Sequence, residues 1–204
     1  YRQRRSEARA QASSQKNAVS GSAISVIDGG VRKALDVGAL QEVVHAACEG
    51  LGNDVNPQII IEETLRNIYD GVPVDELRKS SILSARALIE KDPAYSYVTA
   101  RLLLHTIRLE VLGEEVGQSE MGGRYADYFP EFIRKGIQAE LLDPKLATFD
   151  LRKIGKALDA SRDLKFGYLG LQTLYDRYFL HVQEKRIELP QAFFMRVAMG
   201  LALN

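Results

Sequence analysis

The sequence has a single cysteine, no tryptophan and no long apolar run. One cysteine, Cys48, excludes an internal disulfide, a zinc site built from cysteines, and any reaction that needs two thiols of this chain. No stretch approaches the roughly 20 apolar residues of a membrane span, and the chain does not open with a signal-peptide pattern. We therefore expect a reducing, cytoplasmic setting.

Net charge is also lacking, because 27 lysines and arginines balance 27 aspartates and glutamates. A neutral chain creates no global field toward nucleic acid or an acidic membrane, so any charged partner must use a local patch. With 204 residues and 46% apolar content, the chain can bury a sizeable core, which excludes disorder throughout. It opens at Tyr1 rather than at methionine, so we expect it to be part of a longer protein.

The sequence contains few groups of residues that could form a catalytic, metal-binding or phosphate-binding site. The histidines His45, His105 and His181 are far apart in the sequence, so no metal site is expected. The Asp-Gly-Gly turn at 28–30 lacks the spacing of a phosphate-binding loop, and the chain has no GxSxG nucleophile elbow. We therefore expect no catalytic residue in this segment, and we interpret Cys48 as a small buried hydrophobe.

The chain begins with a basic stretch, followed over residues 13–22 by a segment rich in Ser, Ala, Gly and Asn. This pattern predicts the end of one element and then a linker over residues 1–22. Two interpretations stay open for Arg2, Arg4 and Arg5: a phosphate-binding patch, or the solvated basic end of a helix.

The pattern over residues 23–113 predicts a small hairpin followed by four helices. Two short β-like runs, 23–27 and 31–35, flank the Asp-Gly-Gly turn. Apolar residues at helical spacing, bounded by proline and glycine, predict the helices. They are expected over residues 37–49, 57–68, 75–90 and 95–112.

Residues 114–126 are predicted to form a linker, since Gly and Glu dominate their first part. The remainder is predicted to be helical with one short hairpin, so the fold class is mainly α. The expected elements are helices over 130–139, 150–160 and 167–177, a hairpin from 178–182 and 186–189, and a last helix from residue 190. The last helix is apolar to the chain end, so we expect its packing partners to lie outside this chain.

Several phrases resemble one protein family. ACEGL (47–51), NIYDGV (67–72) and above all EKDPAYSYVTARLLL (90–104) are similar to the amino-terminal region of the class I ribonucleotide reductase large (alpha) subunit. DYFPEFIRKGIQ (127–138) and SRDLKFGYLGLQTLYDRYFL (161–180) resemble the helical segment that leads into the catalytic barrel of that family. The resemblance covers about residues 23–204.

The resemblance implies a domain organisation. Residues 1–22 would be the end of a preceding ATP-cone domain and a linker, and residues 23–113 a second cone, a four-helix bundle capped by a small sheet. Residues 114–126 would be a linker, and residues 127–204 the truncated helical beginning of the catalytic domain. The family's reaction uses three cysteines, so its active site would lie after this segment, which would hold no metal and no cofactor of its own.

The resemblance also implies regulation and partners. The parent would be a cytoplasmic ribonucleoside-diphosphate reductase, with ATP and dATP as allosteric effectors and cones that set the oligomeric state. Its partners would be the upstream cone and the downstream barrel of the same chain, other large subunits, and a radical-generating small subunit. Neither nucleic acid nor a membrane is an expected partner.

In a nucleotide-binding cone of this family, basic residues face the phosphates, and this sequence departs from that pattern. Five positions that are basic in the family pattern hold an apolar, acidic or neutral residue in this chain. Arg78 stands where the family pattern has a histidine. Lys33 and Arg78 remain as cationic candidates. The five degenerate positions are Ile27, Asp28, Ala39, Thr106 and Leu109.

The energy of the lost contacts, compared with the free energy of ATP binding, indicates how these replacements affect nucleotide binding. A charge-assisted hydrogen bond contributes about 1.5–3 kcal/mol, and micromolar ATP binding corresponds to about 8 kcal/mol. The loss of three such contacts removes most of that binding energy, so we predict a cone that no longer binds ATP or dATP and serves packing or oligomerisation. The alternative is a functional cone whose shifted pocket uses Lys33, Arg78 and Arg108.

Two alternative functions belong to other classes. A transcriptional repressor built on an ATP cone would carry four zinc-binding cysteines ahead of residue 23, and the sequence has none there. A helical nucleic-acid-binding module would use Arg2, Arg4 and Arg5, but zero net charge argues against it.

Overall fold

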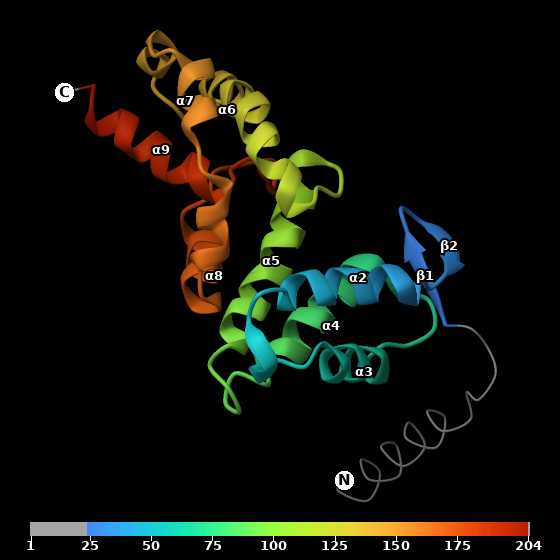
Figure 1. Ribbon diagram of the computed structural model, residues 1–204. Helices are drawn as coiled ribbons and strands as arrows, with labels where there is room; N and C mark the ends of the chain where they lie inside the picture. The colour runs from blue at the N-terminus through green and yellow to red at the C-terminus, as the bar shows by residue number, and fades with distance from the viewer. Residues whose placement is uncertain (1–23, 204) are drawn as a thin grey trace, which may run out of the picture.

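The structure is a computed structural model that describes residues 24–203 (Figure 1). The expectations for residues 1–22, including those for Arg2, Arg4 and Arg5, lie outside the described residues. The fold is mainly helical with two small sheets, which confirms the predicted fold class. Within residues 24–203, no helix is both long enough and apolar enough to cross a membrane.

Three short strands and four helices make up the first half of the structure, residues 24–113. The helix predicted over 95–112 has those bounds, whereas the one predicted to reach residue 90 ends at Arg86 and is followed by turns. In Figure 1 the sheet lies beside one end of α2. The elements are β1 (Ser25–Asp28), β2 (Val31–Ala34), α2 (Val37–Cys48), α3 (Pro57–Asn67), β3 (Val72–Pro73), α4 (Val74–Arg86) and α5 (Tyr95–Leu112).

The sheet has the strand order β2-β1-β3, in which β1 pairs antiparallel with β2 and parallel with β3. Gly29 and Gly30 join β1 to β2 with φ angles of 55° and 83°, the left-handed conformation that tight hairpin turns require. Asp70 fastens the sheet to the turn before β3, because it accepts hydrogen bonds from the backbone N–H and hydroxyl of Ser25 at 2.9 and 2.6 Å. Strand β3 was not predicted, because two residues show no periodicity.

Helices α2, α3 and α4 each bury one apolar face, whereas α5 is buried on more than one side, and local signals fix the start of α3 and the end of α5. α3 begins at Pro57 behind Asn56, whose side chain accepts a hydrogen bond from the backbone N–H of Gln58 at 2.9 Å. α5 ends at Gly113, where φ is 77°. The almost fully buried core residues include Val44, Ile60, Val98, Leu104 and Ile107. Cys48 is also buried, as predicted, and burial raises the pKa of its thiol to about 11.

The second half, residues 114–203, is helical apart from one short hairpin, as the sequence predicted. The hairpin strands are shorter than expected, with two residues each. The elements are α6 (Met121–Gln138), α7 (Leu151–Ala157), α8 (Tyr168–Arg177), β4 (His181–Val182), β5 (Lys185–Arg186) and α9 (Pro190–Leu201).

The segment expected to be a linker over residues 114–126 is only partly one. Helix α6 already begins at Met121, where the sequence predicted a helix over 130–139, so the expected start was wrong. A pair of glycines suggested a linker, but Met121, Tyr125 and Phe129 follow each other at helical spacing and are fully buried on one face. Burial of this face outweighs the low helix propensity of the two glycines.

Helix α6 continues through Pro130 and packs closely on α7. A proline has no N–H to donate to the carbonyl four residues earlier, which here belongs to Ala126. Gly155 of α7 approaches that carbonyl so closely that an added Cβ would lie 2.9 Å from the oxygen. The two helices therefore meet at a point where one lacks a hydrogen bond and the other lacks a side chain.

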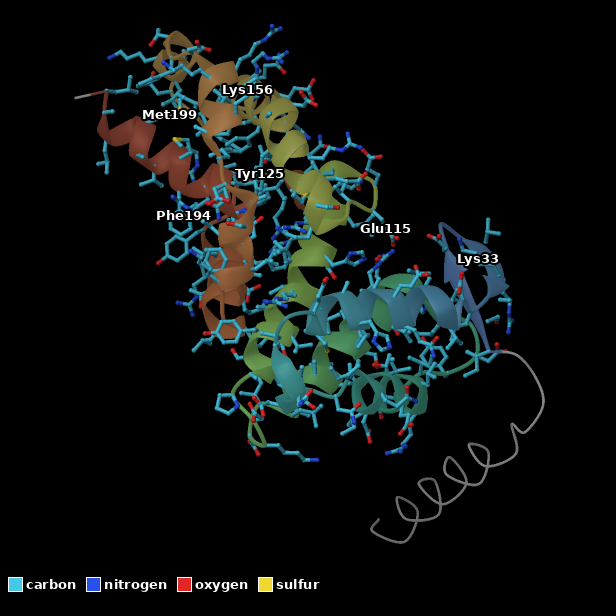
Figure 2. The ribbon with its side chains drawn as sticks, viewed as in Figure 1. Lys33, Glu115, Tyr125, Lys156, Phe194 and Met199 are labelled. Carbon is cyan, nitrogen blue, oxygen red and sulfur yellow. The ribbon has the colours of Figure 1, made fainter. Side chains whose placement is uncertain are left out.

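The second half packs along α5, chiefly through α8 and to a lesser extent through β5 and the 3₁₀ helix Ala160–Lys165. At this junction Asp163 is 1% exposed and accepts three hydrogen bonds. The donors are the guanidinium of Arg108 at 3.1 Å, the hydroxyl of Tyr125 at 2.9 Å and the side-chain amide of Gln191 at 2.8 Å. Figure 2 shows Tyr125 in the interior of the second half. One buried carboxylate therefore joins α5, α6 and α9.

Glu110 makes a second polar contact between α5 and the second half. Its carboxylate accepts a hydrogen bond from the hydroxyl of Tyr175 and another from the backbone N–H of Arg186, both at 2.8 Å. The guanidinium of Arg186 also lies over the Tyr175 ring, 3.7 Å from its centroid. These contacts hold α8 and β5 against α5.

Helix α9 leaves part of its apolar surface uncovered. Phe194, Val197 and Leu201 are 49%, 41% and 72% exposed, while Met199 is buried. Figure 2 labels Phe194 and Met199 on this helix. The expectation that its packing partners lie outside this chain stays a prediction.

Candidate functional site

A cavity of about 430 Å³ lies between the sheet and helices α2, α4 and α5. We call it the sheet pocket. Apolar side chains from β1, α2, α4 and α5 form much of its wall, including Val26, Leu40, Leu77 and Leu102. Its polar lining consists of Asp28, Lys33, Asp36, Arg78, Ser81, His105, Thr106 and Glu115.

The structure brings some of the residues singled out in the sequence to this pocket and not others. Asp28, Lys33, Ala39, Arg78 and Thr106 line it. The remaining three do not line it: Ile27 is 37% exposed, Leu109 is half-buried on α5, and Arg108 is buried against the second half. The three cations of the shifted-pocket alternative are therefore not gathered in one place.

Lys33 is already engaged by an acid within the pocket. Its Nζ lies 2.7 Å from Oδ2 of Asp28, across the β1–β2 hairpin. The hydrogen bond from Lys33 lowers the pKa of Asp28, so the carboxyl is charged at neutral pH. Both side chains are about half exposed. An incoming anion would have to compete with Asp28 for this lysine.

Arg78 is held by two carboxylates. It forms an ion pair with Asp75, one turn earlier on α4, at 3.0 Å, and a longer contact of 4.0 Å with Glu115. Its side chain is 24% exposed, so these acids act on it with less screening by water than they would at the open surface. Figure 2 shows Lys33 on the sheet and Glu115 on the segment that follows α5.

The N-terminus of α2 also opens on the pocket. Free N–H groups at a helix N-terminus attract phosphate groups. Here the side chain of Asp36 accepts a hydrogen bond from the backbone N–H of Ala39 at 2.9 Å, so the helix is capped by its own carboxylate. This cap places a negative charge where a phosphate would otherwise bind.

His105 adds no positive charge to the pocket at neutral pH. It lies on α5, 3.7 Å from Glu115, and burial lowers its pKa. Three acidic side chains, Asp28, Asp36 and Glu115, therefore outnumber two cationic ones among the residues that line this pocket. The arrangement suits a small apolar or neutral ligand better than a triphosphate.

Sequence reasoning did not single out Asp36 or Glu115 as site residues. Asp36 carries a detectable signal, since an aspartate directly before an apolar helical pattern predicts an N-cap. Glu115 lies next to Glu114 in a stretch rich in Gly and Glu, a pattern typical of an exposed segment. It reaches the pocket only because the chain turns back after α5, and no local pattern shows this return.

The three histidines lie on different elements, His45 on α2, His105 on α5 and His181 on β4. Within residues 24–203, no three side chains of the metal-ligating types gather in one place.

Comparison with known proteins gives related sequences along most of the chain. Residues 164–204 match the family model described as the ribonucleotide reductase all-alpha domain. The chain is 41% identical over 159 residues to the ribonucleoside-diphosphate reductase subunit alpha of Chlamydia muridarum, an alignment covering 78% of this chain and 15% of that protein. It is 32% identical over 173 residues to the subunit alpha of Helicobacter pylori, covering 83% of this chain and 21% of that protein.

More distant similarity extends to eukaryotes. The ribonucleoside-diphosphate reductase large subunit of Plasmodium falciparum is 25% identical over 158 residues, covering 76% of this chain and 19% of that protein. The chain thus spans between about one seventh and about one fifth of the length of these relatives.

Proposed function

We propose that this chain, which is related to the ribonucleotide reductase large subunits along most of its length, is a regulatory and structural segment of such a subunit. The parent is then a class I ribonucleoside-diphosphate reductase, a cytoplasmic enzyme of deoxyribonucleotide synthesis. Residues 23–113 form an ATP cone that has lost nucleotide binding and serves packing or oligomerisation. The reductase reaction takes place in a part of the protein that follows this segment.

The cysteine content supports a non-catalytic role for this segment. The radical chemistry implied by the resemblance needs three cysteines, and this chain has one. Cys48 is buried in the helical core of the first half, and a thiol with a pKa of about 11 is almost entirely protonated at neutral pH. A thiol in this state is a poor nucleophile and a poor redox partner.

The proposal that the cone binds no nucleotide rests on the charged side chains that line the sheet pocket. A triphosphate needs cations that are free to meet it, and the two cations of this pocket are already paired with Asp28, Asp75 and Glu115. The Asp36 cap on α2 adds repulsion. Micromolar ATP binding corresponds to about 8 kcal/mol, which this lining does not supply.

Isothermal titration calorimetry with ATP and dATP tests this proposal on the 204-residue chain. We expect no saturable binding below about 1 mM, which corresponds to less than about 4 kcal/mol. Micromolar binding of either nucleotide would overturn the proposal and favour a functional cone.

A double variant that restores cations, Asp28→Arg with Ala39→Lys, sharpens the test because both positions line the pocket. We expect this variant to bind ATP measurably more tightly than the unmodified chain. The matched control is Glu62→Arg with Gln41→Lys, which adds the same charge at exposed positions outside the pocket. Equal gains in both variants would show only a general effect of net charge.

The regulatory part of the proposal concerns the parent protein. If this cone is silent, ATP and dATP act through an upstream cone of the same chain, and this cone buttresses the assembly with other large subunits and the radical-generating small subunit. Deletion of the upstream cone from the full-length protein should then abolish inhibition by dATP while residues 24–203 stay folded. Retained inhibition would contradict the proposal.

A further inference from the structure

A groove of about 620 Å³ runs between helices α3 and α4 in the first half of the structure. We call it the α3–α4 groove. It shares no lining residue with the sheet pocket. In Figure 1, α3 lies at the end of the molecule away from α6 and α7. Ile59 of α3 and Leu83 of α4 line the groove and are 39% and 57% exposed, so the described residues leave it open to water.

The α4 side of the groove consists of one large apolar side chain among short ones. Ser80, Leu83 and Ala87 follow each other at intervals of three and four residues, which places them on one face of the helix. Ser84 lines the groove beside them. The side chains around Leu83 are therefore short enough to receive a bulky side chain from another helix.

The charges that line the groove are balanced. Two are acids and two are lysines: Glu63, Glu76, Lys79 and Lys91. Glu63 pairs with Arg66 at 2.5 Å, and Glu76 accepts a hydrogen bond from the Tyr69 hydroxyl at 3.1 Å. Within residues 24–203, neither Glu76 nor Lys91 forms an ion pair. This face thus has no net charge, and two copies of it do not repel each other.

Glu76 and Lys91 are placed symmetrically about the centre of α4. Glu76 lies seven residues before Leu83, in the first turn of the helix, and Lys91 lies seven residues after Ser84, in the turns that follow it. If two copies of this face meet antiparallel about a two-fold axis at Leu83 and Ser84, each Glu76 comes opposite the Lys91 of the other copy. Each Leu83 then meets the short side chains of the other groove.

We propose that the α3–α4 groove is a self-association surface that joins two copies of this chain through antiparallel pairing of their α4 helices. Removal of both Leu83 side chains from water drives the association. The two ion pairs between Glu76 and Lys91 fix its direction, since exposed pairs add little affinity. A single pair of helices buries less than a standard interface, so the dimer is weak. The inference rests on the packing or oligomerisation role proposed above for residues 23–113 and names its surface.

Sedimentation equilibrium of the 204-residue chain, from about 5 to about 500 μM, tests the proposal. We expect a concentration-dependent dimer and at least about a tenfold weaker association in Leu83→Glu, because two like charges then meet at the two-fold axis. The matched control is Leu169→Glu, which makes the same change at a 77% exposed position of α8. This control should dimerise as the unmodified chain does, and equal urea midpoints show that both variants stay folded.

Charge reversal tests the direction of the pairing. Glu76→Lys and Lys91→Glu should each weaken association about fivefold, and the double variant should restore it, because the two charges are exchanged across the interface.

The proposal is overturned if the chain stays monomeric throughout the range or if Leu83→Glu weakens association no more than Leu169→Glu. It is also overturned if the double charge reversal associates as weakly as the single ones. None of these results bears on nucleotide binding, which the calorimetric titration of the sheet pocket measures separately. A failure here is therefore distinguishable from a failure of the proposal that the cone binds no ATP or dATP.

Discussion

Asp163 is a buried acid that accepts hydrogen bonds from three helices, and this environment determines its pKa and its contribution to stability. Burial raises the pKa of Asp163, while hydrogen bonds from Gln191, Tyr125 and Arg108 and the charge of Arg108 oppose this rise. A buried ion pair adds little compared with a well-packed apolar pair, but the loss of one partner leaves the other charge uncompensated. The pair with Arg108 is therefore costly to break.

We expect Asp163→Ala to lower the free energy of unfolding by about 3–5 kcal/mol, because it leaves the Arg108 guanidinium buried without a counter-charge. Urea denaturation followed by circular dichroism measures this change. The control is Glu63→Gln, which breaks the exposed ion pair with Arg66 and should change stability by less than about 1 kcal/mol. Equal effects of the two substitutions would contradict the structural role of Asp163.

Asp70 provides a prediction about pH. Hydrogen bonds from the hydroxyl and backbone N–H of Ser25, and then from Arg32, lower its pKa from 3.8 to about 2. A carboxyl whose pKa is lower in the folded state stabilises the fold above pH 3.8, and this contribution is lost as the pH falls toward 2. The sheet should therefore lose this support only in strong acid.

We expect Ser25→Ala to raise the pKa of Asp70 toward its usual value, because it removes the largest single cause of the shift. Carboxyl carbon chemical shifts recorded by NMR over the acid range report this pKa directly. Ser161→Ala should leave it unchanged, since Ser161 hydrogen-bonds to Asp159 in the second half. An unchanged Asp70 pKa in Ser25→Ala would be the contrary result.

At the scale of elements, the contact between α6 and α7 shows how a sequence irregularity is accommodated. Pro130 has no N–H to donate to the carbonyl of Ala126, and the missing side chain of Gly155 lets α7 lie against that carbonyl. Both residues look unfavourable for helices when taken singly. The absence of a Cβ at Gly155 permits the close contact with α6, because an added Cβ would lie 2.9 Å from the Ala126 oxygen.

We expect Gly155→Ala to destabilise the protein by about 1–3 kcal/mol, because the new Cβ would lie 2.9 Å from the Ala126 oxygen and 3.3 Å from the Phe129 Cβ. Gly170→Ala, in α8, is the matched control, since nothing lies within 4 Å of its added Cβ. That control should be stabilising by about 0.5–1 kcal/mol through helix propensity. Thermal or urea unfolding of both variants gives the comparison.

Elements with strong local signals could be predicted from the sequence. The bounds of α5 could be predicted because apolar residues recur at helical spacing over 18 residues and Gly113 follows them. A glycine at this place favours a helix end, and Gly113 does adopt the left-handed conformation. The start of α6 and strand β3 were missed, because tertiary packing rather than local pattern determines both. In the sheet pocket the family resemblance indicated Lys33 and Arg78, but their acidic partner Glu115 depends on the path of the chain after α5.

At the scale of the whole molecule, α5 belongs to the cores of both halves. One side of it packs on α2 and α4, and the other carries α8, β5 and the Arg108 and Glu110 contacts. Neither half can lose α5 without exposing its own core. The two halves should therefore unfold together.

We expect one cooperative transition in urea, with the same midpoint for two probes placed in different halves. The first probe is the labelling rate of the Cys48 thiol, which is buried in the first half. The second is the hydrogen exchange of the α6 amides in the second half. Two separated midpoints would show that α5 does not couple the halves.

The shared helix also limits how such proteins can be recombined. A chimaera that joins the sheet-capped bundle of one relative to the second half of another, with a crossover at Gly113, keeps only one side of α5 matched to its surroundings. Arg108 and Glu110 would then face a foreign set of acids, amides and aromatic rings in place of Asp163, Tyr175 and Arg186. When the first half is exchanged between relatives, the residues of α5 that face the second half should therefore come from the same protein as the second half.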